Sequence, residues 1–469
     1  MRLPQAPPPL EKLFAKVGTK RMAAMLPQAA TLWRQDRYLH WNELRRRPAP
    51  DDLTHEEWWL LVKMGRGPNL RQIPLADKAG RPFQFSIPVQ LIELLHLIDR
   101  GLGSAWNLPA AVTHPSTRGE YVVSTLIQES ITSSQLEGAV TTRDVAKEML
   151  RSGRAPRDKS ERMILNNYRT MQRIMDVRAE PLTPELVFEL HRRVTEGTLE
   201  REDAAGRFRT DAELIRVMDM EGNVFHEPPP AIELPQRLAA MCDFANQQTP
   251  EFFLHPVIRA ILLHFWLAYD HPFVDGNGRT ARALFYWLML HQGLELFEFI
   301  SISQILLQAP TPYALAFLHT ETDDNDLTYF ILHQASVIRR AVQALHDFVA
   351  HKTALLRSTE KHLRTSDAIN HRQQALLAHA IRNPDTRYTI AGHCNSHAVV
   401  YQTGRTDLLN LVELGLLTVR KSGRAMVFRA VEDLEGKLAN LAKGETPRPL
   451  NTEVGLPLNW SPPDERTAR

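Results

Sequence analysis

Cysteine, long apolar runs and an excess of charge of either sign are all scarce in this chain of 469 residues. Its two cysteines, Cys242 and Cys394, lie far apart, which excludes a disulfide framework and a zinc site with paired cysteine spacing. No stretch approaches the roughly 20 apolar residues of a membrane helix. Residues 1–14 carry prolines where a signal peptide has its apolar segment. We therefore expect a cytoplasmic protein without membrane contact.

The charges of the chain nearly cancel. Lys and Arg number 56 against 54 Asp and Glu, a net charge of +2, so the chain as a whole has no attraction to nucleic acid or to anionic membranes. The content of 43% hydrophobic and 23% charged residues is typical of a folded globular protein. The length exceeds what one hydrophobic core usually supports, and it predicts more than one packed unit.

Helical periodicity dominates the middle of the chain. Thr183 and Pro184 form an N-cap and first-turn pair in front of an apolar-periodic segment. Residues 256–269 are nearly all apolar and predict a helix that is buried on most of its surface. A second apolar helix is expected from residue 278 or 279 to Gly293, whose glycine suits a C-terminal cap. The fold class is therefore mainly α.

Residues 206–230 depart from that helical pattern. Ile215, Val217 and Phe225 flank a turn signal at 221–223, and a triple proline follows. We expect a short β-hairpin there.

The loop between the two apolar helices reads HPFVDGNGRTAR over residues 271–282. Gly276 and Gly278 let backbone amides approach a phosphate closely, and the N-terminus of the following helix adds its free N–H groups. Asn277 contributes a side-chain amide to the same anion site. The loop therefore predicts a site for a phosphate chain.

Charged groups of the same loop complete the chemistry. Arg279 and Arg282 lie three residues apart on one helix face and can hold different phosphates. Asp275 needs a cation to approach the same anion, and Mg²⁺ is the hard divalent metal that suits a carboxylate and phosphates. His271 remains as the general base. Each residue alone is more often structural, but their convergence on one loop indicates phosphoryl-type transfer.

This stretch resembles the signature of the Fic family, His-x-Phe-x-Asp/Glu-Gly-Asn-Gly-Arg-x-x-Arg, with every specified position filled. The resemblance implies a protein adenylyltransferase that moves AMP from ATP to a Ser, Thr or Tyr hydroxyl of a target protein or of itself. By the same resemblance His271 deprotonates the hydroxyl, Asp275 holds Mg²⁺ and Phe273 is a core residue that fixes the loop. The implied phosphate contacts come from Gly276, Asn277, Gly278, Arg279 and Arg282.

A second segment resembles the inhibitory motif of that family, Ser/Thr-x-x-x-Glu-Gly/Asn. Ser133 and Glu137 lie one helical turn apart, and Gly138 follows. Without the loop motif this would read as an ordinary helix end capped by glycine. The resemblance implies that Glu137 pairs with Arg282 and takes the place of the ATP γ-phosphate, so that basal activity is low. The expected hairpin likewise resembles the family's flap, which aligns a target segment by strand pairing, although a purely structural hairpin is the alternative.

The C-terminal part shows a helical pattern followed by two short β-type runs, 416–420 and 425–429, around a Ser-Gly turn. It resembles a winged helix. Basic residues could contact DNA phosphates, but the near-neutral chain favours a protein-binding or regulatory role, and a salt-dependent duplex-binding assay separates the two. The candidates are Arg405, Arg420, Lys421, Arg424 and Arg429.

These observations divide the chain into an N-terminal helical region (1–110), a catalytic core with the inhibitory helix (111–345), a linker and winged helix (346–440) and a flexible tail (441–469). The N-terminal tryptophans Trp33, Trp41, Trp58 and Trp59 are expected to pack rather than to bind a ligand. Two alternative functions stay open: removal of AMP by the same site, and a nucleotide-sensing regulator that binds DNA. A homodimer is possible under each of them.

Overall fold

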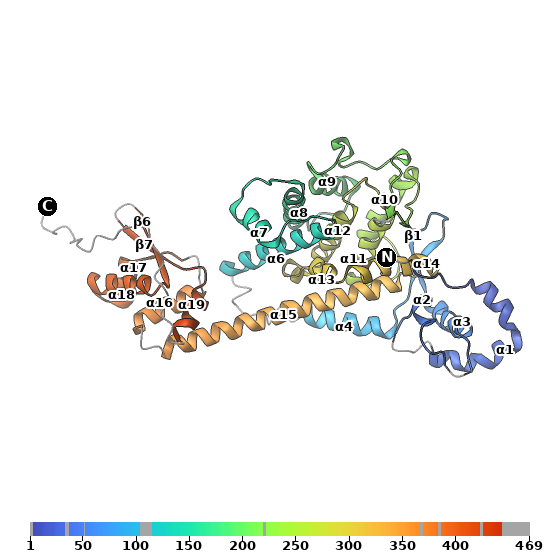
Figure 1. Cartoon of the computed structure of the whole chain (residues 1–469), viewed down its shortest axis with the longest axis horizontal. Coiled ribbons are helices and arrows are strands. Elements are labelled where there is room, and N and C mark those ends of the chain that lie inside the picture. The colour runs from blue at the N-terminus through green and yellow to red at the C-terminus, as the bar shows by residue number, and fades with distance from the viewer. Residues whose placement is uncertain are drawn as a thin grey trace. The chain divides into compact units, whose positions relative to one another are not determined.

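The computed structural model describes residues 3–32, 37–50, 52–103, 115–218, 222–365, 369–382, 386–422 and 425–442. The chain divides into two compact units (Figure 1). Unit 1 contains residues 1–108 and 119–346, and unit 2 contains residues 109–118 and everything from residue 347 onward. Trp33, Arg424 and nearly all of the predicted tail over 441–469 lie outside the described residues. Within the described ranges no helix combines the length and the apolar composition of a membrane span.

Two helices that pack on each other form the centre of unit 1 (Figure 1): α11 (Pro256–Asp270) and α12 (Asn277–His291). Both are buried on nearly every face, and Trp266 and Trp287 are among their fully buried side chains. Burying a large apolar side chain contributes about 1.5–3 kcal/mol, so this pair gives the unit its stable core. The two buried helices around the glycine-rich loop are thus confirmed, with α12 beginning slightly earlier than predicted.

The remaining helices of unit 1 surround this pair. As predicted, Thr183 caps the helix that follows it by accepting a hydrogen bond from the Leu186 N–H. Gly293 follows α12 with a φ of +77°. The helices of unit 1 are α1 (Leu10–Leu32), α2 (Trp41–Leu44), α3 (His55–Arg66), α4 (Val89–Gly103), all but the first residues of α6 (Pro115–Leu136), α7 (Arg143–Ser152), α8 (Lys159–Asp176), α9 (Pro184–Thr195), α10 (Leu234–Ala245), α13 (Ile302–Gln308), α14 (Pro310–Thr322) and the first part of α15 (Thr328–Thr365).

The N-terminal region also holds a two-stranded antiparallel sheet that was not predicted, β1 (Arg71–Ala76) and β2 (Pro82–Phe85). The turn between the strands is closed by Asp77, whose carboxylate accepts from the Ala79 and Arg81 N–H groups. Gly80 takes a φ of +76° in that turn, a conformation that favours glycine. A helical description of residues 1–110 is therefore incomplete.

The described tryptophans of this region pack as expected: Trp41, Trp58 and Trp59 are buried in one apolar cluster with Leu44 and Leu61.

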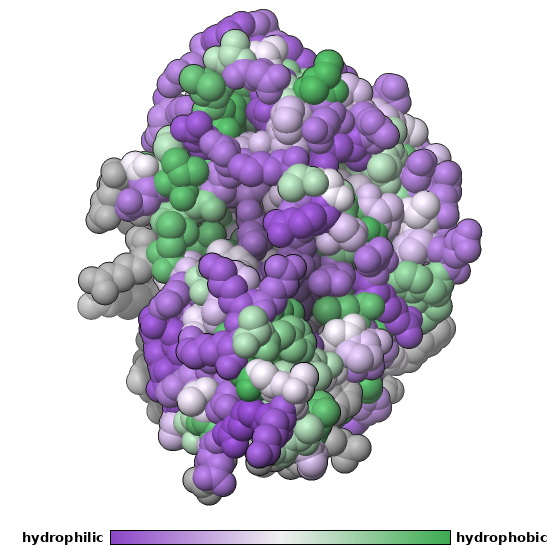
Figure 2. Space-filling model, turned by 90° about the vertical axis from the view of Figure 1, so that its right-hand side faces the viewer, coloured by the Kyte–Doolittle hydropathy of each residue, from purple (hydrophilic) through white to green (hydrophobic). Residues whose placement is uncertain are grey.

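The face of the molecule drawn in Figure 2 is mostly hydrophilic, with hydrophobic side chains in separate groups.

Two buried cations of α3 join the N-terminal region to the rest of unit 1. Lys63 Nζ lies 2.8 Å from Asp323 Oδ1, at the end of α14. Arg66 donates to the Tyr329 hydroxyl over 2.8 Å and stacks on the Tyr38 ring at 3.6 Å. Breaking a buried pair of this kind by removing one partner typically costs about 3–5 kcal/mol. The N-terminal helices are therefore held firmly at the C-terminal end of α14.

The short hairpin predicted in the middle of the chain is present. It consists of β3 (Val217–Met218) and β4 (Val224–His226), paired antiparallel with Val217 opposite His226. Residue 221 of the predicted turn lies outside the described residues. Leu214 and Met218 are exposed apolar side chains on this segment, at 76% and 53% of their full accessibility.

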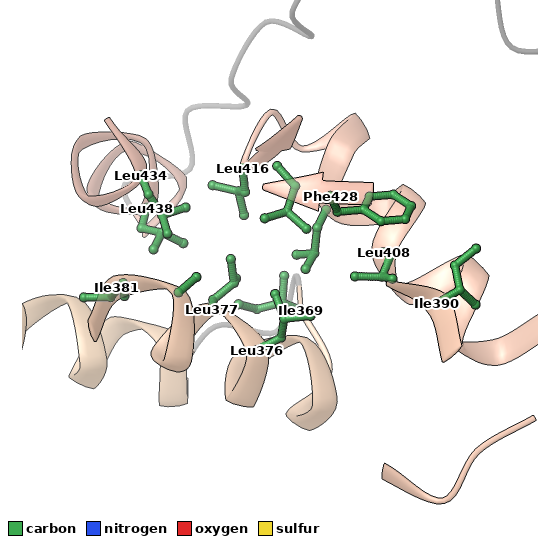
Figure 3. Packing of buried hydrophobic residues seen from close by; sticks show 13 residues of the cluster. Ile369, Leu376, Leu377, Ile381, Ile390, Leu408, Leu416, Phe428, Leu434 and Leu438 are labelled. Atoms are coloured by element: carbon green, nitrogen blue, oxygen red, sulfur yellow. The ribbon is translucent and has the colours of Figure 1, made fainter. Parts of the chain in front are cut away.

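Unit 2 has one apolar core, which Figure 3 shows from close by. Leu376 and Leu377 point from one helix toward Phe428 on the central strand of a three-stranded sheet. The sheet order is β5-β7-β6. The elements are α16 (His371–Arg382), β5 (Tyr388–Thr389), α17 (Ile390–His397), α18 (Tyr401–Glu413), β6 (Leu417–Ser422), β7 (Ala425–Ala430) and α19 (Leu434–Ala442). This order of elements is compatible with a winged helix, which stays a prediction.

Asp407 on α18 connects the helices of unit 2. Its carboxylate accepts hydrogen bonds from Arg372 (2.7 Å), Asn370 (2.7 Å) and His393 (3.1 Å). Burial opposes ionisation, but these partners together lower the pKa of Asp407 to about 2. A carboxyl with a lowered pKa stabilises the fold above its unfolded pKa, near 3.9, and this contribution is lost as pH falls toward 2.

Candidate active site

The loop of residues 271–276 leaves α11 and enters α12 through two left-handed residues. His271 follows the last residue of α11, takes φ 45° and ψ 55°, and its N–H donates to the Leu267 carbonyl over 3.0 Å. Gly276 precedes α12 with a φ of +83°. A Cβ at Gly276 would lie 2.6 Å from Thr195 Cγ2, so both the backbone angle and the close packing require glycine here.

The imidazole of His271 is held in one tautomer. Its Nδ1 lies 3.2 Å from the Ala268 carbonyl oxygen, which can only accept, so Nδ1 carries the proton and Nε2 keeps its lone pair. Burial lowers the pKa of His271 to about 4, against the weaker opposite effects of the Ala268 carbonyl and Glu137. The ring is therefore neutral at pH 7, with a basic nitrogen available.

The turn of the loop is fixed by side chains that bind its backbone. Asn277 donates to the Phe273 carbonyl over 2.8 Å and accepts from the Phe273 N–H over 3.0 Å. His191 of α9 contacts the Asp275 carbonyl at 2.8 Å and stacks on the buried Phe273 ring at 3.7 Å. The amide of Asn277 thus shapes the loop, a structural role that the sequence did not indicate.

Arg279 is fully buried beneath the N-terminal turn of α12. One guanidinium nitrogen donates to the Val194 carbonyl over 2.9 Å, and another lies 3.6 Å from Asp275 Oδ1. Among the described residues, Arg279 Nε and Nη2 have no hydrogen-bond partner. Buried donors of this kind are rare in folded proteins because they lose water without replacement. The cation therefore adds positive potential where helix α12 begins.

Arg282 lies one turn further along α12 and is bound by the segment around Glu137. Its Nη2 lies 2.8 Å from Glu137 Oε1, and its Nε donates to Ser133 Oγ over 2.8 Å. The Ser133 carbonyl accepts a further bond from Nη2 over 2.9 Å. Gly138, with a φ of +91°, ends this segment after α6. The spacing of the inhibitory motif thus brings Ser133 and Glu137 onto the same guanidinium.

The Glu137 carboxylate also covers the first turn of α12. A Cβ at Gly278 would clash with the carboxylate oxygens of Glu137. Because a helix N-terminus carries unsatisfied N–H groups and a positive dipole end, an anion is stabilised there by about 0.3–1 kcal/mol. Glu137 therefore lies where the N-terminus of α12 favours an anion.

Asp275 meets the requirements of a Mg²⁺ ligand. Its side chain is 46% exposed, and one oxygen accepts from the Gly276 N–H over 2.5 Å. In the described ranges no three His, Cys, Asp or Glu side chains gather as a metal cage. Mg²⁺ bound together with substrate phosphates needs only one or two protein carboxylates, so a single exposed aspartate beside the anion loop fits that ion.

All the sequence-predicted site residues thus lie around one loop, but the sequence did not reveal three side chains that hold it. These are His191 on α9, Arg209 ahead of the hairpin and His226 at the end of β4. Each acts on backbone carbonyls far away in the chain. A single sequence carries no signal for such pairings.

Comparisons with known proteins match the part of the chain that holds this loop. The Fic/DOC family model matches residues 181–289, which include both α9 and the loop. A protein of Nematostella vectensis named protein adenylyltransferase Fic is 29% identical over 207 residues, 43% of this chain and 45% of that protein. A Drosophila melanogaster protein of the same name is 36% identical over 107 residues, 23% of this chain and 20% of that protein. The chain thus spans less than half the length of these curated relatives.

A solved structure gives the same result for the fold. The crystal structure of a Fic family protein from Desulfovibrio desulfuricans G20 covers 74% of this chain and 98% of its own, with a TM-score of 0.50 and 17% identity. At that identity the likeness concerns the fold alone. This likeness confirms the predicted mainly helical fold with a short hairpin, and the segment 181–289, which carries the complete loop motif, matches the Fic/DOC family model.

Proposed function

We propose that this chain is a protein adenylyltransferase, which transfers AMP from ATP to a hydroxyl of a target protein or of itself. The observation that carries the proposal is the juxtaposition of a neutral His271, whose Nε2 is basic, with the helix N-terminus and the buried cation of Arg279. A base beside an anion site is what attack of a hydroxyl on a phosphate requires. The names of the relatives support the same activity.

In the proposed reaction His271 Nε2 accepts the proton of the target hydroxyl as its oxygen attacks the α-phosphate of ATP. The bond from the α-phosphorus to the bridging oxygen breaks, and pyrophosphate leaves. The N–H groups at Gly276 and Gly278 and the guanidinium groups of Arg279 and Arg282 bind the phosphate oxygens. Such preorganised donors act where negative charge develops, and they typically supply the largest share of the acceleration.

Mg²⁺, held by Asp275 and the phosphates, would neutralise charge on the leaving pyrophosphate. Asp275 itself lies 3.6 Å from the Arg279 guanidinium, so its carboxylate is oriented on the same side of the loop as the anion site. Asn277 holds the loop in shape through the two bonds to Phe273.

The position of a radioactive label tests the reaction. With ATP labelled at the α-phosphate, radioactivity should appear on protein in acid-stable form, because AMP is transferred. With ATP labelled at the γ-phosphate the protein should stay unlabelled, because that phosphate leaves in pyrophosphate. Matched reactions with α-labelled UTP and GTP test the choice of nucleotide. Label from the γ-position would show phosphoryl transfer, and the proposed reaction would be wrong.

Autoinhibition by Glu137 is part of the proposal. The ion pair to Arg282 and the close approach to Gly278 place a carboxylate in the anion site before ATP arrives. Because like charges in such a site repel, ATP can bind productively only when Glu137 gives up Arg282. The wild-type chain should therefore work slowly.

The hairpin of β3 and β4 is proposed to align the target segment. Its apolar side chains Leu214 and Met218 are exposed, and β4 ends next to the helix that carries His271. An exposed short strand can pair with an extended peptide through main-chain bonds.

Removal of residues 216–224, the central part of this hairpin, should lower modification of a separate target at least tenfold, because pairing positions the hydroxyl. The affinity for ATP should stay within about twofold, since Arg279 and Arg282 lie outside the deleted segment. Quantitative target labelling and calorimetric ATP titration measure the two effects. Unchanged target labelling would contradict the alignment role.

Unit 2 is proposed to bind a regulatory protein partner rather than DNA. Of its basic residues, Arg372 is engaged by Asp407 inside the unit, while Arg420, Lys421 and Arg429 lie on the hairpin of β6 and β7. No aromatic base-stacking pattern accompanies them in the sequence. The duplex-binding assay at two salt concentrations tests this choice, because phosphate contacts weaken steeply with salt.

A further inference from the structure

The carbonyl groups at the C-terminal end of α11 are bound by side chains from the hairpin segment. Helix ends leave their last carbonyls without intrahelical partners. Here the Tyr269 carbonyl lies 2.6 Å from His226 Nε2. The Asp270 and His271 carbonyls accept from Arg209, at 3.4 Å to Nη2 and 2.8 Å to Nε. Two basic side chains thus bind three successive carbonyls, those of Tyr269, Asp270 and the proposed base His271.

Arg209 makes two further hydrogen bonds, one to the loop after α11 and one to the segment after β4. Its own N–H donates to the Pro272 carbonyl over 2.9 Å, and its Nη2 also donates to the Pro229 carbonyl over 2.6 Å. Pro229 follows β4, whereas Arg209 precedes β3, so one guanidinium joins both legs of the hairpin to the end of α11. Arg209 is buried, at 5% of full exposure, which makes these bonds hard to replace by water.

His226 has acceptors at both ring nitrogens. Its Nδ1 lies 2.7 Å from Glu321 Oε2, and its Nε2 faces the Tyr269 carbonyl. A carbonyl and a carboxylate can only accept, so both contacts are hydrogen bonds only when both nitrogens carry protons. The imidazole is therefore held as a cation, which is the favourable charge at a helix C-terminus.

Other groups around this imidazole set its titration. Burial lowers the pKa of His226, but the hydrogen bond and charge of Glu321, the Tyr269 carbonyl and the charge of Asp270 together raise it above its ordinary value. Among the described residues, the titratable or charged groups near this imidazole include Tyr269 and Asp270 of α11, Arg237 of α10 paired with Asp270, Asp77 of the β1–β2 turn, the proposed base His271, and Arg209.

We propose that Arg209 and the imidazolium of His226, held by Glu321, are positioning residues that cap α11 and so fix the backbone that orients His271. Only the predicted effect on the reaction rate rests on the proposed function. His271 occupies a left-handed conformation that non-glycine residues rarely adopt. The capped carbonyls on both sides hold that conformation, and through it the direction of Nε2. Protonated His226 thereby joins the target-aligning hairpin to the base.

The sign of the pH effect follows from the raised pKa of His226. The cap is complete below that pKa, and one of its bonds is lost as pH rises through it. The base itself titrates near pH 4. The rate should therefore rise through about pH 4 and fall again on the alkaline side, and the alkaline decline should depend on Glu321.

Glu321→Gln in a Glu137→Gly parent is the decisive variant. It removes the charge that supports the imidazolium, so the alkaline decline of kcat should move about 1–3 pH units toward acid. ATP affinity should stay unchanged, because Glu321 lies outside the anion loop. Glu189→Gln, which removes a similarly buried paired carboxylate on α9, is the matched control and should keep the parent's profile. Superimposable profiles for parent and Glu321→Gln would overturn the proposal.

A second measurement does not depend on catalysis. Hydrogen exchange of the amides over residues 267–273 should be about tenfold faster in His226→Ala than in the parent at pH 7, since opening no longer breaks the cap bond. His226→Gln, whose amide can donate to the Tyr269 carbonyl without titrating, should restore most of the protection and flatten the alkaline decline. Equal exchange in His226→Ala and the parent would overturn the cap, whereas absent AMP transfer in every variant would overturn the proposed function alone.

Discussion

Replacing Glu137 with glycine should raise the AMP incorporated from α-labelled ATP by about 10- to 100-fold over the wild-type chain. The estimate comes from the bond that ATP must displace. A hydrogen bond to a charged group contributes about 1.5–3 kcal/mol, and each 1.4 kcal/mol changes an equilibrium tenfold. In the wild type Glu137 Oε1 holds Arg282 Nη2 at 2.8 Å. In the variant that guanidinium is available to a phosphate.

The same substitution also clears the first turn of α12. The Glu137 oxygens lie so close to Gly278 that a Cβ there would clash with them. Removing the carboxylate therefore removes a negative charge from the position where the helix N-terminus would bind phosphate. ATP affinity should rise together with the rate, and Mg²⁺ should increase both.

Two further variants separate loss of charge from loss of structure. Glu137→Gln keeps the size of the side chain but leaves only a neutral acceptor for Arg282, so its activity should fall between wild type and Glu137→Gly. Ser133→Ala removes the hydroxyl that accepts from Arg282 Nε at 2.8 Å but keeps the carboxylate, so it should activate far less than Glu137→Gly. If Glu137→Gly and the wild type incorporate equal amounts of AMP, the inhibitory role assigned to Glu137 is wrong.

The activating substitution should cost stability. Arg282 is buried at 2% of full exposure and loses its charged partner, whereas the Glu137 side chain was 26% exposed. Removing one partner of a buried pair can cost about 3–5 kcal/mol. Here the loss should lie at the lower end of that range, because Arg282 keeps its bonds to Ser133 and water can reach the position that the Glu137 side chain vacates. Saturating ATP should then recover part of the melting temperature through linkage.

The sequence was sufficient for those parts of the site that lie within one short segment. Gly276 and Gly278 could be assigned to close backbone approaches because glycine has no Cβ, and the structure shows that an added Cβ would meet Thr195 at Gly276 and the Glu137 carboxylate at Gly278. Apolar periodicity gave the two buried helices because a helix must bury its apolar face. The pairing of Glu137 with Arg282 was anticipated only through the family motif, since nothing in the spacing of two distant segments fixes their contact.

Long-range polar contacts were not predictable from one sequence. Arg209 and His226 looked like ordinary residues of a hairpin, yet both bind carbonyls of α11. Lys63 is likewise buried against Asp323. In each case the partner is far away in the chain, and the side chain's role follows from desolvation at that contact rather than from any local pattern. The β1–β2 hairpin was also not predicted, although its turn is closed by local contacts of Asp77 with the Ala79 and Arg81 N–H groups.

Replacing His271 with alanine should lower AMP incorporation by about 10²–10⁴-fold, the usual contribution of a general base. The loss should appear in kcat, because the phosphate-binding groups of α12 remain. ATP titration should give an affinity close to that of the Glu137→Gly parent in which the substitution is made. Since the pKa of His271 is about 4, the parent should keep its base function down to about pH 5 and lose it as pH falls through 4.

Alanine at residue 271 also strains the backbone, so a second variant is needed to separate this strain from the loss of the base. His271 has a φ of 45°, where alanine is strained but asparagine is tolerated. His271→Asn should therefore fold as stably as the parent and still lose the activity, because an amide cannot accept the proton. His255→Ala, at the opposite end of the same helix, controls for the loss of a capping histidine. Activity of His271→Asn near that of the parent would show that the ring fixes the loop rather than moving the proton, and the base would have to be sought elsewhere.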